Sequence, residues 1–325
     1  MASDIYFTKE HEMVRKAVRD FVNKEINPYV DEWEEKGEAP LHDLFRKMGD
    51  LGFLGIRYDP KYGGEGLDYW YDLVFLQELG RIQGLGLAVA ITVQTHMCTP
   101  AIAEFGSDYL RKTYLMPAIA GDLVGAIAVT EPGAGSDANS GKTKAVLSED
   151  GKYYKITGQK MWISNAGFCN LFIVFARIED DKYITGFIVE NDPDNGISLG
   201  DEEKKLGIHS SSTRQVFFNE TKVPVENMLS ERGNGFKIAM NALNVGRIKL
   251  AAACLEAQRR VTDEAVRYAK ERVQFKTPII NFGAIKAKIA TMATNAYVGE
   301  SASYRAARDI QDRIAMRVAE GNSHA

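Results

Sequence analysis

Apolar residues recur at helical spacing over the first third of the chain. One pattern begins after Thr8, with Glu10 in its first turn and Pro28 beyond its end; its apolar positions are Val14, Ala17, Val18, Phe21 and Val22. An acidic residue near the start and a proline past the end are typical helix boundaries. Similar patterns cover residues 41–48, 73–79 and 102–115. The sequence therefore predicts a mostly helical N-terminal part.

The pattern changes near Gly121. Short runs rich in β-branched and aromatic residues follow, separated by clusters of Gly, Asp and Asn, at residues 153–156, 171–178, 183–189 and 215–218. Such runs between turn-forming residues predict strands. We therefore expect a compact β domain over residues 121–232.

Helical spacing returns after the turn at residues 232–235. One long helix is predicted to about Lys270 and a second from Phe282 to about Val318, with Pro278 between them. Two long antiparallel helices cannot close a core alone, so they need other helices of this chain or of a partner. The order of helical, strand and helical patterns along the chain predicts an α+β multidomain fold, with helical domains at residues 1–120 and 233–325.

Composition is that of an ordinary folded protein. The 325 residues are 45% apolar and 26% charged, and the net charge is −4. This balance gives no field that would favour nucleic acid or an anionic membrane. The longest apolar run, at residues 85–91, is too short to span a bilayer, and the start lacks a secretory signal. We therefore expect a cytoplasmic protein without a transmembrane segment, or a matrix protein if a mitochondrial transit peptide has been removed.

Cysteine and histidine give little chemistry. Cys98, Cys169 and Cys254 are odd in number and widely spaced, which predicts buried free thiols rather than disulfides or a zinc site. The five histidines have no nucleophile or metal-ligand companion at useful spacing, so hydrolase and metalloenzyme functions are not supported. The three glycines at residues 63–66 lack the context of a phosphate-binding loop and predict only a loop.

Two segments stand out as candidates for ligand binding. The first, residues 126–137, reads Ala-Ile-Ala-Val-Thr-Glu-Pro-Gly-Ala-Gly-Ser-Asp, and the second, residues 158–165, reads Gly-Gln-Lys-Met-Trp-Ile-Ser-Asn. They combine glycines and hydroxyl side chains with a flat aromatic ring, which suits a planar cofactor with polar edges. Taken alone, the first segment could equally be a tight loop after a buried strand, with Ser136 and Asp137 as turn residues.

Together the two segments resemble the acyl-CoA dehydrogenase family of flavoproteins. The resemblance covers nearly the whole chain and includes further short matches at residues 62–67, 205–208, 223–227, 235–236, 246–247 and 272–275. Each match is weak alone, but their order and spacing together are highly specific. The resemblance implies an N-terminal helical domain, a middle β-barrel domain that binds flavin and substrate, and a C-terminal helical bundle.

The implied cofactor is FAD. By position in the family motifs, its contacts would be Val129, Thr130 and Ser136 on the first segment and Trp162 and Ser164 on the second. A flavin needs an aromatic or apolar wall and a few hydrogen bonds, because the hydride chemistry belongs to the cofactor. Trp162 would supply that wall. For any tryptophan met in isolation, a core aromatic is the alternative interpretation.

The resemblance also implies a homo-oligomer, a dimer of dimers. Arg272, Gln274 and Phe275 match the motif that reaches the FAD of the neighbouring subunit, with the arginine as a forked donor to the pyrophosphate. A solvated arginine at a helix end is the alternative. Lys276 stands where the family usually has glycine, which leaves the geometry of this turn open.

For the acyl-CoA substrate, Ser136, Asn244 and Arg247 fall on positions that contact it in the family. Asn244 and residues 281–283 resemble the very-long-chain branch and hint at longer acyl groups. Small residues at 84, 86 and 88 either permit a deep slot for the acyl tail or only let two helices approach.

The implied activity is α,β-dehydrogenation of an acyl-CoA thioester to a trans-2-enoyl-CoA, as in fatty acid β-oxidation, with electrons passed to an electron-transfer flavoprotein. A carboxylate must remove the α-proton. One family position for it is Gly246 here, and the commoner C-terminal stretch is not in this sequence. We therefore expect a C-terminally truncated chain whose base is unknown, with Glu131 a local hydrogen-bond acceptor rather than the base. An acyl-CoA oxidase or flavin monooxygenase on the same fold, or a non-catalytic binding fragment, are the alternatives.

Overall fold

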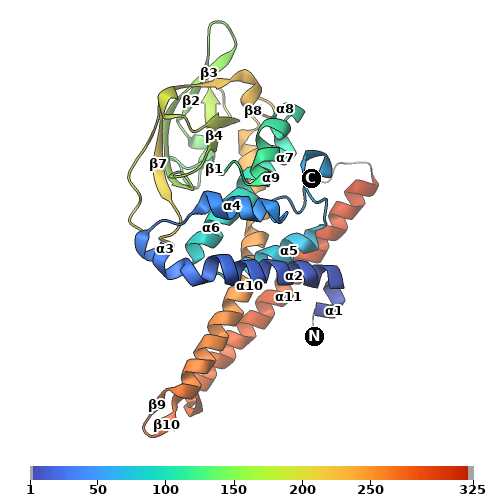
Figure 1. Cartoon of the computed structure of the whole chain (residues 1–325). Coiled ribbons are helices and arrows are strands. Elements are labelled where there is room, and N and C mark those ends of the chain that lie inside the picture. The colour runs from blue at the N-terminus through green and yellow to red at the C-terminus, as the bar shows by residue number, and fades with distance from the viewer. Residues whose placement is uncertain (1–2, 321–325) are drawn as a thin grey trace. The chain divides into compact units, whose positions relative to one another are not determined.

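The computed structural model describes residues 3–320 and has the expected α+β fold (Figure 1). Helices come first, a β-sheet region follows, and two long helices end the described chain. By their internal contacts the residues form two compact units. The helical unit comprises residues up to 28, 68–83 and from 247 on, and the β unit comprises Tyr29–Leu67 and Gly84–Gly246. The three consecutive domains expected from the sequence stay a prediction.

The β unit is built on one eight-stranded sheet. Its strands are β1 (Gly125–Ala128), β2 (Lys144–Leu147), β3 (Tyr153–Ser164), β4 (Leu171–Ile178), β5 (Thr185–Glu190), β6 (Ile197–Leu199), β7 (Thr213–Pro224) and β8 (Met228–Leu229). Their order is β6-β7-β3-β2-β4-β5-β8, with β1 paired to β4. Among the strands at 125–229, these pairings give an open path and not a closed ring. The predicted middle β domain is confirmed as a β-sheet domain.

Strand β4 is buried on both faces, and it separates two hydrophobic cores. On one face Phe172, Val174 and Ala176 pack among the other strands. On the other face Ile173 and Phe175 pack against side chains of the neighbouring helices. A strand covered on both sides has no polar face, which explains the continuous apolar run that predicted it.

Short helices cover the sheet of the β unit: α3 (Val30–Lys36), α4 (Leu41–Asp50), α6 (Leu85–Val93), α7 (Thr99–Phe105), α8 (Asp108–Leu110) and α9 (Met116–Ala120). The single helix expected over 102–115 is broken after α7. Gly106 is extended there, and the Ser107 hydroxyl accepts from the Leu110 N–H to start the next helix. A glycine followed by a good N-cap residue stops and restarts a helix.

The helical unit contains α1 (Ser3–Tyr6), α2 (Lys9–Phe21), α5 (Tyr69–Leu79), the later part of α10 (Gly235–Glu271) and α11 (Gly283–Ala319). The two long helices match the bounds predicted from the sequence to within about one residue. Between them lies a short hairpin of β9 (Val273–Gln274) and β10 (Thr277–Pro278).

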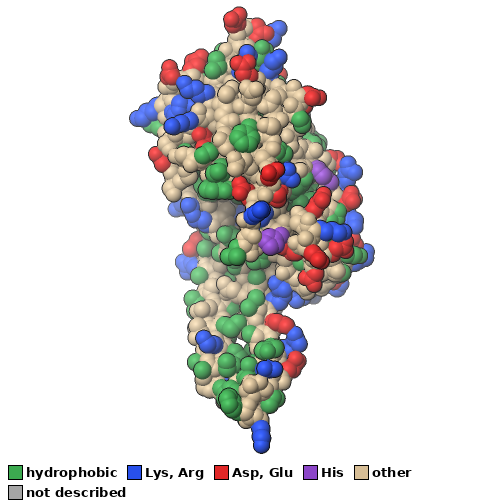
Figure 2. All heavy atoms as spheres, turned by 90° about the vertical axis from the view of Figure 1, so that its left-hand side faces the viewer, with side chains coloured by type: hydrophobic (Ala, Val, Ile, Leu, Met, Phe, Trp, Pro, Cys, Tyr) green, Lys and Arg blue, Asp and Glu red, His purple; other side chains and the backbone are tan. Residues whose placement is uncertain are grey.

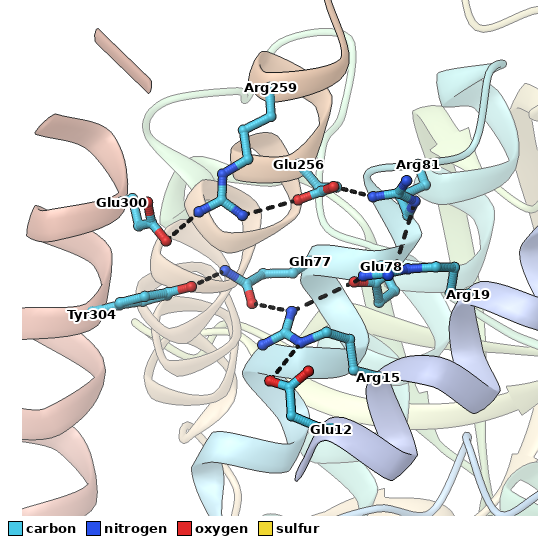
Figure 3. Close-up of polar contacts among 10 residues, drawn as sticks. All are labelled: Glu12, Arg15, Arg19, Gln77, Glu78, Arg81, Glu256, Arg259, Glu300 and Tyr304. Carbon is cyan, nitrogen blue, oxygen red and sulfur yellow. Dashed lines mark hydrogen bonds and ion pairs between the residues drawn. The ribbon is translucent and has the colours of Figure 1, made fainter. Parts of the chain in front are cut away.

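A buried carboxylate lies at the centre of the helical unit (Figure 3). The Glu78 side chain, at the end of α5, is fully buried. It accepts hydrogen bonds from Arg19 at 2.9 and 3.0 Å and from Arg15 at 3.5 Å, both on α2, and Arg81 Nε lies 3.7 Å away. A buried charge is tolerated only when it is paired and hydrogen-bonded. Here three guanidinium groups surround one carboxylate, two of them as hydrogen-bond donors.

Further contacts of this network reach the two long helices. Gln77 accepts from Arg15 Nη1 at 3.0 Å and donates to the Tyr304 hydroxyl of α11 at 2.7 Å. Arg81 pairs with Glu256 on α10, which also contacts Arg259, and Arg259 in turn pairs with Glu300 of α11. Figure 3 shows these side chains pointing toward one another. The network therefore specifies which faces of α2, α5, α10 and α11 meet.

Two helical stretches are long and apolar enough to cross a membrane by length and composition alone, Leu85–Phe105 and Gly235–Glu271. The first is 72% buried inside the protein, as a core helix would be. The second carries Lys249, Glu256 and Arg259 in ion pairs with other helices. Core helices of folded proteins pass the same test, so the expected lack of a transmembrane segment stays a prediction.

The three cysteines are free thiols, as expected, but they differ in exposure. Cys98 and Cys169 are buried, whereas Cys254 on α10 is exposed, which corrects the prediction that all three are buried. Burial raises the pKa of the Cys98 thiol to about 12, so this group stays protonated at neutral pH.

The Glu78→Gln substitution should destabilise the protein by about 3 kcal/mol, because it removes the buried charge that Arg15, Arg19 and Arg81 are arranged around. Urea unfolding measures the change. The control is Asp20→Asn, which removes the surface pair of Asp20 with Lys16 and should cost less than about 1 kcal/mol. Equal effects of the two substitutions would contradict the central role of Glu78.

Candidate functional site

The first predicted segment forms a tight turn directly after the buried strand β1. Glu131 and Ala134 pair through both backbone bonds, at 3.0 and 3.1 Å. Val129 and Thr130 are partly exposed and Ser136 is exposed. The turn expected as the alternative interpretation of this segment is therefore present, and it leaves the Thr130 and Ser136 hydroxyls accessible to a ligand.

The second segment contains a bulge in β3 that turns Trp162 outward. Lys160 pairs with Val216 of β7 and Ile163 with Arg214, so two residues of β3 lie between partners that only one residue of β7 separates. Trp162 has φ of 57° and its side chain is 59% exposed. The core-aromatic alternative is therefore wrong. A positive φ at a non-glycine residue costs about 1–3 kcal/mol and persists only where the surroundings impose it.

The turn and the bulge are joined by a direct hydrogen bond. The Met161 N–H, which lies within the bulge, donates to the Thr130 carbonyl at 2.9 Å. Thr130 accepts this bond, and Trp162 is the residue next to its donor. The bond therefore restrains the position of Trp162 relative to Thr130. The structure therefore brings Thr130 of the first segment close to Trp162 of the second.

Asn165 ends the bulged strand and was not assigned a role from the sequence. It is fully buried with φ of 67°, and its Nδ2 donates to the carbonyls of Ala90 at 3.0 Å and Gly125 at 3.4 Å. Asparagine tolerates the left-handed region better than most residues. An Asn followed by Ala and Gly at a strand end was the available signal.

Lys160 is the second residue that sequence reasoning missed. Its side chain is 1% exposed, and Nζ donates to Glu131 Oε1 at 2.8 Å and to the carbonyls of Phe175 at 2.7 Å and Val129 at 3.3 Å. The alternation of buried residues Tyr154 and Ile156 along β3 would have placed position 160 on the inward face.

Glu131 is a local acceptor, as the sequence predicted. Besides Lys160, its carboxylate accepts from the N–H groups of Lys142 at 2.6 Å and Thr143 at 3.1 Å. Burial favours the neutral acid, but the Lys160 ammonium and the amide donors outweigh it, so the pKa of Glu131 lies below its usual value. An ionised carboxylate with three donors is a weak proton acceptor, which argues against Glu131 as a catalytic base.

A small cavity of about 310 Å³ is lined in part by the turn. Its lining residues are Glu131, Pro132, Gly133, Ala134, Ser140, Lys142, Thr143, Gly158 and Gln159. Ser136, Trp162 and Ser164 are not among them. The cavity is therefore distinct from the surface formed by the predicted flavin contacts.

The predicted substrate contacts Asn244 and Arg247 lie three residues apart on α10, and both are exposed. This spacing puts them on one face of the helix. Asn244 belongs to the β unit with Ser136, whereas Arg247 belongs to the helical unit.

The predicted residues Arg272, Gln274 and Phe275 lie at the exposed hairpin between α10 and α11 (Figure 1). Phe275 and Lys276 form its two-residue turn, with φ of 50° and 59°. Positive φ at both central residues is the requirement of a type I′ turn, so lysine occupies a left-handed position that favours glycine. Phe275 is 91% exposed.

The small residues Gly84 and Gly86 allow close packing of their neighbours. A Cβ at Gly84 would lie 2.6 Å from Val30 Cγ1, and one at Gly86 would lie 2.4 Å from Ser210 Oγ. Distances below 3.0 Å require the neighbour to move. Of the two alternatives left open by the sequence, the structure supports close approach at these positions.

Models of three domains match the chain in order. They are the acyl-CoA dehydrogenase N-terminal domain at residues 8–122, middle domain at 126–221 and C-terminal domain at 233–322. A solved acyl-CoA dehydrogenase complexed with FAD from Bacillus anthracis has a TM-score of 0.91 and 37% identity, over 95% of this chain and 52% of its own.

Curated relatives of the chain are also acyl-CoA dehydrogenases or related CoA-dependent enzymes. A probable acyl-CoA dehydrogenase of Bacillus subtilis is 40% identical over 97% of this chain and 52% of its own length, so the chain spans about half of that relative. A short-chain specific acyl-CoA dehydrogenase of Clostridium acetobutylicum is 37% identical over 89% of this chain and 76% of its own length. A caffeyl-CoA reductase-Etf complex subunit of Acetobacterium woodii is 36% identical over 93% of this chain and 80% of its own length.

These relatives correct the resemblance to the very-long-chain branch that Asn244 and residues 281–283 suggested. Those two short matches do not separate the branches, whereas identity over most of the chain points to short-chain and bacterial enzymes.

Lys276→Gly should stabilise the protein by about 0.5–1 kcal/mol. Glycine relieves about 1–2 kcal/mol of left-handed strain, partly offset by the greater entropy of the unfolded chain. The matched control is Lys288→Gly within α11, which should destabilise by about 1 kcal/mol. Urea unfolding of both variants gives the comparison, and a loss of stability at position 276 would exclude the strained turn.

Glu131→Gln should destabilise the protein by about 3 kcal/mol at neutral pH. Because folding lowers the pKa of Glu131, its contribution is present above the unfolded pKa of about 4.3 and is lost as the pH falls through the lower folded value. The gap between wild type and variant should therefore shrink below about pH 4. Urea unfolding across pH tests this, with the exposed Glu149→Gln as control; a gap independent of pH would contradict it.

Proposed function

The chain belongs to the acyl-CoA dehydrogenase family, and we propose that its protein uses FAD to oxidise an acyl-CoA thioester to a trans-2-enoyl-CoA. One observation carries the proposal. The indole of Trp162 is turned outward on a strained bulge, one residue from a hydrogen bond to Thr130. Strain of this kind is typical of ligand sites.

The residues around the bulge fit a flavin. Trp162 offers an exposed aromatic face, Val129 offers an apolar side chain and backbone groups, and the hydroxyls of Thr130, Ser136 and Ser164 offer hydrogen bonds. A bound flavin supplies the acceptor for the substrate's β-hydrogen, which no side chain can provide. The protein's part is to hold the ring and keep its polar edge bonded.

We propose that Ser136, Asn244 and Arg247 bind the acyl-CoA. The substrate loses its α-proton to a carboxylate, and this base is a residue other than Glu131, whose oxygens already accept three donors. Hydrogen bonds to the thioester oxygen would raise the acidity of the α-carbon. Short acyl groups are favoured, because Gly84 and Gly86 are packed against neighbours and a short-chain specific relative is 37% identical.

We also propose a homo-oligomer, a dimer of dimers, in which the hairpin reaches the FAD of a neighbouring subunit. Phe275 is 91% exposed at the hairpin turn, where its ring also packs edge-on against Phe282, and covering both rings with a partner would bury apolar surface. Arg272 would donate to the pyrophosphate, and Gln274 lies beside it on β9. Figure 2 shows further apolar side chains over the face of α10 and α11, consistent with a surface that a partner covers.

The proposed electron acceptor is an electron-transfer flavoprotein. The support is the relative from Acetobacterium woodii, which is a subunit of a caffeyl-CoA reductase-Etf complex. A cytoplasmic location, expected from the sequence, is in keeping with the bacterial relatives.

Anaerobic titration of the FAD-reconstituted full-length protein with butyryl-CoA tests the proposal. We expect loss of the oxidised flavin absorption, restored by an electron-transfer flavoprotein and weaker with palmitoyl-CoA. Free CoA and butyrate are controls that should leave the spectrum unchanged. Peroxide formed under air without an acceptor would indicate an oxidase, and a flavin that no acyl-CoA reduces would indicate a binding role only.

A further inference from the structure

We propose that Lys160 is a positioning residue of the flavin site: its buried ammonium holds the turn after β1 against the bulge in β3 and so sets the separation of Thr130 from Trp162. This inference rests on the proposed function for its ligand. The contacts that carry it lie wholly within the β unit.

The ammonium joins three segments of the chain. Its acceptors are the Val129 carbonyl and Glu131 Oε1 of the turn and the Phe175 carbonyl of β4. An ammonium has three N–H donors, so these three acceptors satisfy it completely. Because Lys160 is 1% exposed, no solvent replaces an acceptor that moves away, and the three segments must keep their places together.

The residue that follows in the chain completes the link. Lys160 contacts positions 129 and 131 of the turn, and Met161 donates to the carbonyl of the residue between them, Thr130. Three successive residues of the turn are therefore bonded to two successive residues of β3. Trp162 comes next, where the backbone takes its positive φ, so the bulge starts from a fixed point.

Glu131 extends this control to Ser136. Its carboxylate accepts from the N–H groups of Lys142 and Thr143, which closes the base of the loop that runs from 131 to 142. Ser136 lies in the middle of that loop. Lys160 is thus linked to the loop that carries Ser136 through the Glu131 carboxylate, and to Thr130 and Trp162 through Val129 and Met161, although it is itself too buried to touch a ligand.

A purely structural role makes a different prediction from a positioning role. If the pair only stabilised the β unit, its loss would lower stability and leave flavin affinity in the folded fraction unchanged. If it positions the site, affinity and the flavin spectrum change beyond what lost stability explains. Misplacement of binding groups by about 1 Å is enough to produce effects of about 100-fold.

The experiment compares Lys160→Met with Val223→Ala in the full-length protein. Methionine keeps the length of the side chain and removes its charge and donors. Val223 is 1% exposed and pairs with Tyr154, at the other end of the β3–β7 ladder from the bulge, which makes it a matched control for stability. We expect Lys160→Met to weaken FAD binding about 10–100-fold and shift the flavin absorption bands. Val223→Ala should change the affinity less than about twofold.

A second readout does not need the flavin. Amide hydrogen exchange of Met161 reports its bond to Thr130, and Lys160→Met should accelerate it while amides near Tyr154 stay protected. If Lys160→Met does not fold, Glu131→Gln takes its place, since it keeps the lysine's bonds to Val129 and Phe175. It should weaken FAD binding by a smaller factor, about 3–10-fold, and accelerate the same amide.

Wild-type affinity and spectrum in the folded variant, or an unchanged Met161 exchange rate, would overturn the positioning role. Failure of the wild-type protein to bind FAD would instead overturn the proposed function. The exchange rate of Met161 then decides alone whether Lys160 fixes the bulge, so the two failures are distinguishable.

Discussion

The arrangement of the candidate site depends on one buried ammonium and its three oxygen acceptors. Lys160 lies on the inward face of β3, where an apolar residue would be expected, and only Glu131 and two backbone carbonyls make its burial tolerable. Each acceptor belongs to a segment that must therefore stay in register with β3. The polar requirement of one side chain thus fixes the turn after β1, the start of the bulge and the neighbouring strand β4.

The fold could be predicted from the sequence wherever the pattern is long and local. The helices α10 and α11 and the strand β4 match their predicted bounds closely, because sustained periodicity or a continuous apolar run specifies them without help from distant residues. The short strands β2, β6 and β8 were not predicted, since runs of two to four residues carry little pattern of their own and their pairing with β3, β7 and β5 defines them. The division of helices between the two units is likewise a property of tertiary contacts.

In the candidate site, too, features set by local residue types could be predicted, whereas features set by distant pairing could not. The residue types of both segments pointed to a flavin, yet the direction of Trp162 depends on a bulge that the pairing with β7 creates, which no local pattern reveals. At the hairpin, Lys276 in place of glycine left the turn geometry open. The turn persists because the two long helices bring residues 274 and 277 together, so that tertiary structure imposes a backbone conformation that lysine disfavours.

Each unit buries a charged side chain, Glu78 in the helical unit and Lys160 in the β unit, but the two are held by different kinds of partner. Glu78 is shared by the long guanidinium side chains of Arg15 and Arg19 on α2 and of Arg81 just after α5, so its pairs specify how these two helices meet. Lys160 instead bonds mainly to backbone and to a carboxylate that itself holds backbone, so it restrains the main chain directly. Side chains that move can adapt to a lost partner, whereas backbone cannot do so without changing the loop it belongs to. That difference is why the pair in the β unit, and not the larger network of the helical unit, bears on ligand binding.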